Sequence, residues 1–387
     1  MRVDELRVDP WGEGRELSGR ISFERVGLEP QRLWFRSPVA PVGQLDASPF
    51  LPALLVLSMW LGEPLAIEGP VSPRLLENVD RASLVLRSWW PQLEPARVEP
   101  AGAEAPPQDG GDMGVFFTRG VDSWHSALET ARDAPAGLRL LGWVGGDLES
   151  PEHDNPQRRV AAEEALTEAA GLVPAEVDLM QSNLRRLVEP HVAWEWTHGG
   201  LLAALALAHG GLAEARIAGT LPFGSLTSLG SHPLLDPLWS TETTRVIHHA
   251  PEVTRVEKIA VLAEWPEVLG TLKVCDELDD PRRNCGRCGK CTRTMVGLEI
   301  AGVLGQAPFD APLTQRSVAR IPVSASLERE FGYELLRALS GARRPDLSDP
   351  LQMAFAADLA RRAWRRAWVV ARGRLRRGIH RLGSRSG

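Results

Sequence analysis

The residues with the clearest chemistry are the four cysteines of the chain. They fall in one short segment with the spacing C-x9-C-x2-C-x2-C, as Cys275, Cys285, Cys288 and Cys291. Two intervening residues let successive thiolates turn back toward one ion, and four sulfurs at about 2.3 Å complete a tetrahedral zinc site. Such a site has no open position for a substrate, so we expect a structural zinc ion. Gly286 and Gly289 fit the left-handed turns that this motif requires.

The alternatives to a zinc site are that these cysteines form disulfides or bind an iron–sulfur cluster. The N-terminal segment alternates charged with apolar residues and lacks the unbroken apolar run of a secretory signal. We therefore expect a cytoplasmic, reducing environment, which disfavours disulfides. Zinc is the prediction, and an iron–sulfur cluster is the second interpretation.

A second segment that could do chemistry is 118–123, which follows the apolar run Gly114–Phe117. That run predicts a buried strand, and apolar residues from Trp124 to Ala131 at i, i+3, i+4 and i+7 predict a helix. A short loop between a strand and a helix presents free backbone amides and the helix dipole to an anion. We expect phosphate binding here, although a chance strand-turn-helix remains the alternative. The residues concerned are Thr118, Gly120, Val121, Asp122 and Ser123.

Strands and helices are expected to keep alternating after this loop. The apolar pattern predicts strands at 138–144, 175–180 and 215–219, with helices at 156–170 and 201–208. This alternation favours an α/β fold with a doubly wound parallel sheet, whose ligands bind at the carboxyl ends of the strands. Asp147 follows the predicted strand 138–144 after two glycines, and the Gly219-Thr220 pair lies at the end of the predicted strand 215–219.

The rest of the chain is predicted to form additions to this layer. Residues 1–110 are expected to be a small α+β domain that ends in a linker rich in Ala, Pro and Gly. Residues 111–310 hold the α/β domain with the cysteine motif at 275–291, and residues 311–387 are expected to be a helical extension. In that extension Ser348 and Asp349 precede Pro350, which predicts a capped helix start there.

The C-terminal tail has an unusual charge. Residues 361–387 contain ten arginines and no acidic residue, whereas the whole chain carries a net charge of -6. An approximate apolar stripe among the arginines predicts a basic amphipathic helix that packs on the acidic body. Binding to a partner protein, to nucleic acid or to an anionic surface is the alternative. Gly373 and Gly378 argue against one continuous helix, and no apolar run is long enough for a transmembrane span.

The loop resembles that of the PP-loop ATP pyrophosphatase superfamily, Ser-Gly-Gly-x-Asp-Ser, with Arg119 where the family has glycine. Within that superfamily the 7-cyano-7-deazaguanine synthase family carries a C-x8-C-x2-C-x2-C knuckle in the same order and at a similar separation. The segments 255–259 and 272–275 also look like parts of that family, and the Gly219-Thr220 pair resembles its nucleotide-side turn. The resemblance implies that Gly219, Thr220 and Asp147 contact the nucleotide, and a turn cap is the alternative role of Asp147. The resemblance covers residues 114–302.

The resemblance implies a fold of the HUP/PP-loop type and an ATP-dependent, AMP-forming carbon–nitrogen ligase that uses ATP, Mg²⁺ and a structural Zn²⁺. A deazapurine-like carboxylate would be adenylated and then attacked by ammonia or an amine. A catalytically altered nucleotide-binding scaffold and a tRNA-modifying PP-loop enzyme are the alternatives, and a homodimer is left open. The residues with implied catalytic roles are Asp122, Ser123, Arg119 and Lys258.

Substrate contacts are expected in the polar loop that begins at Gly230, although the family's Asp-Tyr-Ser-Gly sequence is absent. Arg119 either supplies a cation to pyrophosphate or marks lost chemistry. His198 is expected to open an apolar helix in a structural or capping role, and the pair His248-His249 lacks an evident metal partner. Fixing the loop is the alternative role of His232 and Asp236, and a surface ion pair is the alternative for Arg293. The candidate substrate residues are Ser231, His232, Asp236 and Arg293.

Overall fold

The computed structural model describes residues 1–25, 27–39, 45–104, 111–133, 137–143, 156–278 and 280–383. The chain divides into two compact units. The first comprises Met1–Arg283 with Gln306–Pro308, and the second comprises Asn284–Gly305 with Phe309–Gly387.

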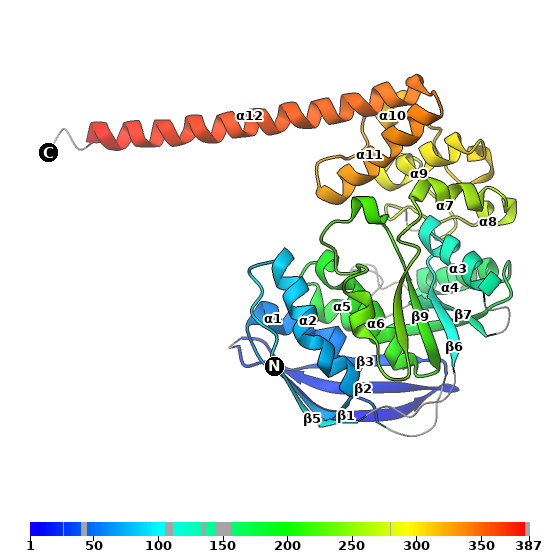
Figure 1. Cartoon of the computed structure of the whole chain (residues 1–387), viewed down its shortest axis with the longest axis vertical. Coiled ribbons are helices and arrows are strands. Elements are labelled where there is room, and N and C mark those ends of the chain that lie inside the picture. The colour runs from blue at the N-terminus through cyan, green and yellow to red at the C-terminus, as the bar shows by residue number, and fades with distance from the viewer. Residues whose placement is uncertain are drawn as a thin grey trace. The chain divides into compact units, whose positions relative to one another are not determined.

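A ten-stranded sheet runs through the described part of the first unit in the order β10-β9-β6-β7-β8-β3-β2-β1-β4-β5 (Figure 1). The strands are β1 (Arg2–Trp11), β2 (Gly14–Ser22), β3 (Gln31–Ser37), β4 (Leu65–Val71), β5 (Val98–Ala103), β6 (Asp112–Phe116), β7 (Leu138–Trp143), β8 (Glu176–Ser182), β9 (Leu212–Ala218) and β10 (Arg245–His249). The predicted α/β class with a mostly parallel sheet is confirmed.

The strands β10, β9, β6, β7 and β8 are all mutually parallel. Counted along the chain from β6, their spatial order is 3-2-1-4-5, which is the order of a doubly wound sheet. The order reverses between β6 and β9, which pair directly. Parallel sheets bind ligands outside the carboxyl ends of the strands at such a switch point, so the segments after β6 and β9 are where a site is expected.

The helices of the first unit are α1 (Phe50–Leu61), α2 (Pro73–Trp89), α3 (Val121–Asp133), α4 (Pro156–Ala170), α5 (Leu184–Val188), α6 (Trp194–His209), α7 (Arg255–Leu262) and α8 (Pro266–Gly270), with 3-10 turns η2 (Phe223–Ser225) and η3 (Asp236–Trp239). Most residues of α1 and α6 are buried, and the two helices pack against each other in the core. Because they are apolar on nearly every side, they require surroundings without water.

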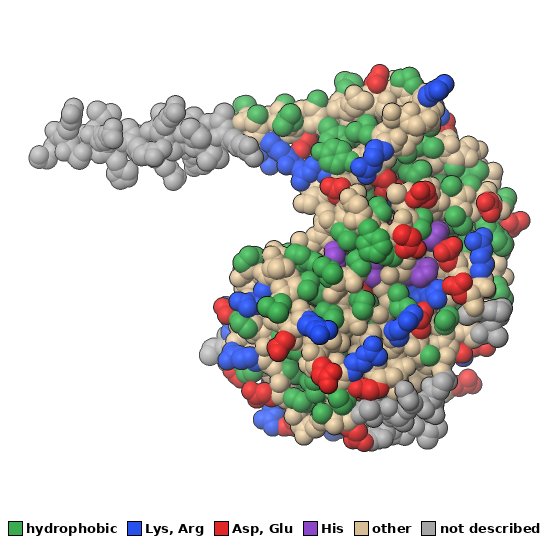
Figure 2. Space-filling view, in the orientation of Figure 1, with side chains coloured by type: hydrophobic (Ala, Val, Ile, Leu, Met, Phe, Trp, Pro, Cys, Tyr) green, Lys and Arg blue, Asp and Glu red, His purple; other side chains and the backbone are tan. Residues whose placement is uncertain are grey.

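The first 104 residues continue the same sheet. β3 pairs with β8 in antiparallel fashion, at Phe35 opposite Ser182 and Arg36 opposite Gln181. Basic and acidic side chains are interspersed on the face of this unit that Figure 2 shows. The division at residue 110 into a separate N-terminal domain stays a prediction.

The described second unit is helical, with α9 (Gly289–Ile300), α10 (Gln315–Val318), α11 (Ser326–Gly341) and α12 (Pro345–Gly383). α12 packs on α10 and α11 through its first turns, and its later turns extend past α11 (Figure 1). The helix begins at Pro345 and includes Pro350, so the predicted start at Pro350 is wrong. The predicted interruption at Gly373 and Gly378 is also wrong, because the backbone stays helical to Gly383.

In the described part of the basic tail, Trp364 is 68% exposed and Trp368 is 49% exposed. Arg362 pairs with Asp358 and donates to the Ser324 carbonyl within the second unit. The expected packing of the tail on the body stays a prediction. None of the described helices combines the length with the apolar character that crossing a membrane requires.

The opposite, amino-terminal edge of the parallel strands carries a buried ionic cluster around Asp178. Its Oδ2 lies 3.1 Å from an Arg139 nitrogen and 2.9 Å from His209 Nε2. Burial alone would raise the pKa of Asp178, but His209 and Arg139 outweigh burial and lower that pKa below its ordinary value.

Asp178→Asn should lower the unfolding free energy by about 3–5 kcal/mol, because it leaves buried partners uncompensated. The lowered pKa means that ionised Asp178 stabilises the fold at neutral pH, and that this contribution disappears as pH falls through the folded-state pKa. The difference between variant and wild type should therefore shrink in acid, as urea titrations at several pH values would measure.

Glu176→Gln is the matched control, because Glu176 contacts the same Arg139 at 3.0 Å but is 75% exposed. We expect it to cost at most about 1 kcal/mol. Equal losses in the two variants would contradict the assignment of stability to the buried pair.

Candidate functional site

The predicted phosphate loop lies at the switch point of the sheet, between the end of β6 and the start of α3. Thr118 N donates to Ser123 Oγ at 3.3 Å, and Ser123 Oγ lies 3.1 Å from the Gly120 carbonyl oxygen, to which it donates. Trp124 N makes the first helical bond, to the same carbonyl at 2.9 Å. The amides of Val121 and its two successors precede that bond, so they form the positive end of the helix dipole. This geometry suits an anion.

Gly120 leaves space that the protein does not fill. A Cβ added there would meet Thr118 Oγ1 at 3.4 Å and Lys273 O at 3.8 Å, which are ordinary contacts. By contrast, a Cβ on Gly219 would lie 2.8 Å from His249 O, so packing excludes any side chain there. Packing therefore does not explain a glycine at 120, whereas close approach of a ligand would.

A buried cation joins the loop to the neighbouring strand. Lys258, on α7, is 1% exposed, and its Nζ lies 3.4 Å from Asp122 Oδ1. The same ammonium donates to the Gly219 carbonyl, and Arg255 pairs with the other Asp122 oxygen. The Lys258 ammonium thus links α7 to the Asp122 carboxylate on α3 and to the carbonyl that follows β9.

The charge balance at Asp122 follows from this contact set. Burial alone would raise the pKa of Asp122, but the Arg255 guanidinium and the Lys258 ammonium lower it below its ordinary value. Asp122 therefore stays ionised at neutral pH. Because each of its oxygens already faces a cation, it has little capacity left for a magnesium ion.

Arg119 has a backbone conformation that glycine adopts more readily than other residues. Its φ is +60°, a left-handed conformation that costs an L-residue roughly 1–2 kcal/mol. The side chain is buried, and its guanidinium donates to Pro281 O at 2.7 Å. Burial, with a smaller effect from Arg282, lowers the pKa of Arg119 to about 10, so it remains protonated.

The predicted substrate loop is organised around Asp236, which is fully buried. Its Oδ2 accepts from Ser231 Oγ at 2.7 Å and lies 2.7 Å from His248 Nδ1, while its Oδ1 accepts from His232 N at 3.3 Å. The His232 ring packs on Trp89 at a centroid distance of 4.7 Å. The structure therefore brings Ser231, His232 and Asp236 together, and Asp236 holds the shape of the loop.

Four further predicted residues are not among these contacts in the described part of the chain. His198 lies inside α6, with Nδ1 3.2 Å from Trp194 O, so the prediction that it opens the helix is wrong. Arg293, on α9, stacks over the Phe331 ring at 4.0 Å. Thr220 follows Gly219 directly after β9, and Asp147 lies outside the described residues.

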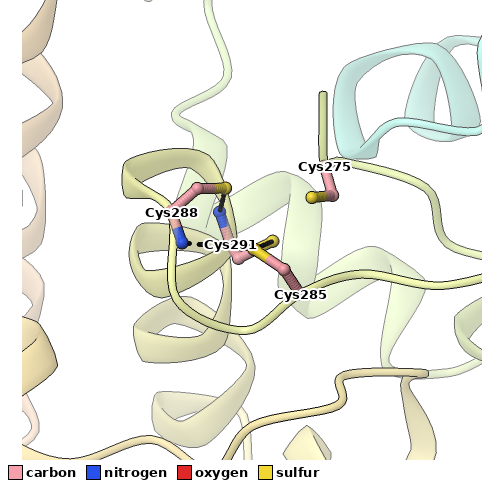
Figure 3. Close-up of side chains that lie close together, drawn as sticks. All are labelled: Cys275, Cys285, Cys288 and Cys291. Atoms are coloured by element: carbon pink, nitrogen blue, oxygen red, sulfur yellow. Dashed lines mark hydrogen bonds between the residues drawn. The ribbon is translucent and has the colours of Figure 1, made fainter. Parts of the chain in front are cut away.

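The four cysteines converge, as Figure 3 shows, with all sulfurs within 4.8 Å of one another. Sulfurs around a tetrahedral ion at about 2.3 Å would be ~3.8 Å apart, and the Cys285 and Cys291 sulfurs are 3.8 Å apart. Cys285 Sγ also accepts from the amides of Arg287 at 3.4 Å and Cys288 at 3.3 Å. Amide donors stabilise a thiolate, so this donor set fits a metal ion such as zinc.

The two glycines of the cysteine motif have different roles. Gly286 has φ +68°, and a Cβ there would lie 2.4 Å from Ala311 O, so both conformation and packing require glycine. Gly289 is not left-handed, and the prediction is wrong there. It begins α9 and is packed against the Pro322 ring, with a Cβ position 2.7 Å from that side chain.

Three residues of the site were not found from the sequence. Arg255 pairs with Asp122, Lys273 N donates to Arg119 O at 3.1 Å, and His248 binds Asp236. A signal existed for Arg255, which occupies the first turn of a helix with a Thr254–Glu257 capping box, close to Lys258. The other two contacts join segments that no local pattern connects.

Metal occupancy can be tested by thiol titration, because the chain has only four cysteines. A thiol reagent should modify none of them rapidly in metal-loaded protein and all of them after chelation, since a coordinated thiolate is a poor nucleophile. Absorbance would count the thiols, and elemental analysis would identify the metal. Full reaction before chelation would contradict a four-sulfur site.

Comparisons of the chain with protein-family models, with curated proteins and with solved structures found no match.

Proposed function

We propose that the chain binds Mg-ATP at the loop 118–123 and is an ATP-dependent, AMP-forming carbon–nitrogen ligase resembling 7-cyano-7-deazaguanine synthase, in a fold of the HUP/PP-loop type. One observation carries the proposal. The amino end of α3 lies at the switch point of a parallel sheet, with the buried Lys258 ammonium linking Asp122 to the Gly219 carbonyl.

The chemistry follows from the stability of a carboxylate. Its oxygen is a poor leaving group, so ammonia or an amine does not displace it. Attack of a carboxylate oxygen on the α-phosphorus of ATP breaks the bond to pyrophosphate and forms an acyl-adenylate. Nitrogen then attacks the acyl carbon, AMP leaves, and a carbon–nitrogen bond has formed.

The loop supplies what the first step needs. Charge builds on the departing pyrophosphate, and preorganised amides with the Ser123 hydroxyl would offset it. Lys258 and Arg255 add positive charge beside these donors, and Asp122 fixes both cations. Magnesium would then rely mainly on phosphate oxygens and water, which it accepts readily.

The loop that begins at Gly230 is the proposed substrate side. Asp236 orders it through Ser231, His232 and His248, so the loop has a defined shape beside which a flat carboxylate substrate of deazapurine type would bind. Thr220, Asp147 and Arg293 remain proposed ligand contacts. The four thiolates would hold a structural zinc ion, which stabilises the segment around them.

Arg119 favours one alternative, a nucleotide-binding scaffold without ligase activity. Its side chain replaces the glycine of the family loop, and it is buried against the Pro281 carbonyl rather than exposed to solvent.

An assay of turnover distinguishes the ligase from the nucleotide-binding scaffold. Protein, Mg-ATP, ammonium and a panel of acids that includes 7-carboxy-7-deazaguanine should yield AMP and pyrophosphate, and product mass would distinguish an amide from a nitrile. ATP binding without AMP formation across the panel would favour the scaffold, whereas absence of ATP binding would reject both.

Gly120→Ala should weaken Mg-ATP binding by at least about tenfold, an estimate equal to the loss of one charge-assisted hydrogen bond. Calorimetric titration measures the affinity, and thermal unfolding should stay within about 1 kcal/mol of wild type because the Cβ meets no close atom. Gly102→Ala is the control, since a Cβ there meets nothing within 4 Å. Unchanged affinity in Gly120→Ala would argue against phosphate at this loop.

A further inference from the structure

The described residues of the segment 273–283, all except residue 279, are folded around the Lys273 ammonium. This group donates to three backbone carbonyls, those of Leu278 (3.2 Å), Asp280 (2.8 Å) and Arg283 (2.9 Å). Cys275 lies within the segment, and Cys285 follows its end by two residues. The segment therefore covers most of the long C-x9-C connection of the cysteine motif, and one internal cation links its described residues.

This segment makes two hydrogen bonds with residue 119 of the phosphate loop. Lys273 N donates to the Arg119 carbonyl at 3.1 Å. In the other direction, the Arg119 guanidinium donates to Pro281 O at 2.7 Å. Glycine could accept the first bond but could not make the second.

We propose that Arg119 is a positioning residue that ties the phosphate loop to the cysteine-flanked segment, so that nucleotide binding and metal retention stabilise each other. The link between Arg119 and metal retention does not depend on the proposed nucleotide site, whereas the effect of ATP rests on it. Arg119 is 5% exposed, and its guanidinium donates to a carbonyl of the segment, whereas its buried Nε has no hydrogen-bond partner among the residues that the structure describes. It therefore acts through the backbone geometry of the loop.

The left-handed conformation of Arg119 supports a role for its side-chain contact. An arginine at φ +60° is strained relative to glycine, so a loop selected only for its shape would be better served by glycine. The guanidinium contact offsets that strain only while the 273–283 segment keeps its shape. Anything that holds the segment, including a metal ion on the cysteines, then favours the phosphate-binding form of the loop. Such coupling is reciprocal.

The test is the rate at which the full-length, metal-loaded protein transfers its metal to a chromophoric chelator. Arg119→Gly and Arg119→Met should release metal about 5- to 150-fold faster than wild type, the usual range of coupling between sites. Arg119→Lys, which keeps one donor, should recover part of the loss. Arg282→Met is the matched control, because Arg282 is a 49% exposed neighbour that pairs with Glu168, and it should behave as wild type.

Thermal unfolding separates the tie from a general loss of stability. Arg119→Gly relieves the backbone strain, so its global stability should be equal to or above that of Arg119→Met, although both release metal faster. Wild-type release rates in Arg119→Gly and Arg119→Met would overturn the proposal. So would equal acceleration in Arg282→Met.

The second measurement is the rate of metal release in the presence of Mg-ATP. Mg-ATP should slow metal release from wild type and have no such effect on Arg119→Gly. If wild type binds Mg-ATP without slower release, the linkage is wrong although the nucleotide site stands. If wild type does not bind Mg-ATP but the variants release metal as expected, the tie stands and the proposed function fails.

Discussion

The buried ammonium of Lys258 is the constraint on which the arrangement of the candidate site depends. A charge with almost no solvent contact costs several kcal/mol unless it is paired and hydrogen-bonded. Here the compensation comes from the Asp122 carboxylate on α3 and the Gly219 carbonyl after β9. Any shift of α3, α7 or β9 relative to the others would leave that charge without a partner. The ion pair therefore fixes the amino end of α3 over the switch point of the sheet.

Because of these contacts, neighbouring residues of the loop have different roles. Asp122 is occupied by two cations, which makes it an organising group, whereas Ser123 and the first amides of α3 stay directed to the loop itself. Gly219 must be glycine because His249 O lies so close to it, but Gly120 is not required by any protein contact. Of these two glycines, only Gly120 is left for a ligand contact to explain.

Local pattern was sufficient for several elements of the sheet layer. The predicted helix 156–170 matches α4 at both ends, and the predicted strand 138–144 matches β7 to within one residue. β10 was not predicted, because a short strand that ends in two histidines has little apolar pattern. Helix α6 begins seven residues before the expected start at Leu201, since Trp, Glu and His in its first turns obscured the periodicity. The cysteine cluster was predictable because its spacing alone determines that the sulfurs can meet.

The contacts that give the site its character were beyond such reasoning for a physical reason. Asp122 and Lys258 are separated by 136 positions, and their pairing depends on how α3 and α7 pack, which no local pattern encodes. At residue 119 the sequence has an arginine where the loop that it resembles has glycine, which suggested either blocked phosphate or an extra cation. The structure gives this arginine a left-handed backbone conformation, and its guanidinium donates to a carbonyl of the 273–283 segment. An arginine at this position can thus adopt a left-handed conformation while its side chain connects the loop to a second part of the chain.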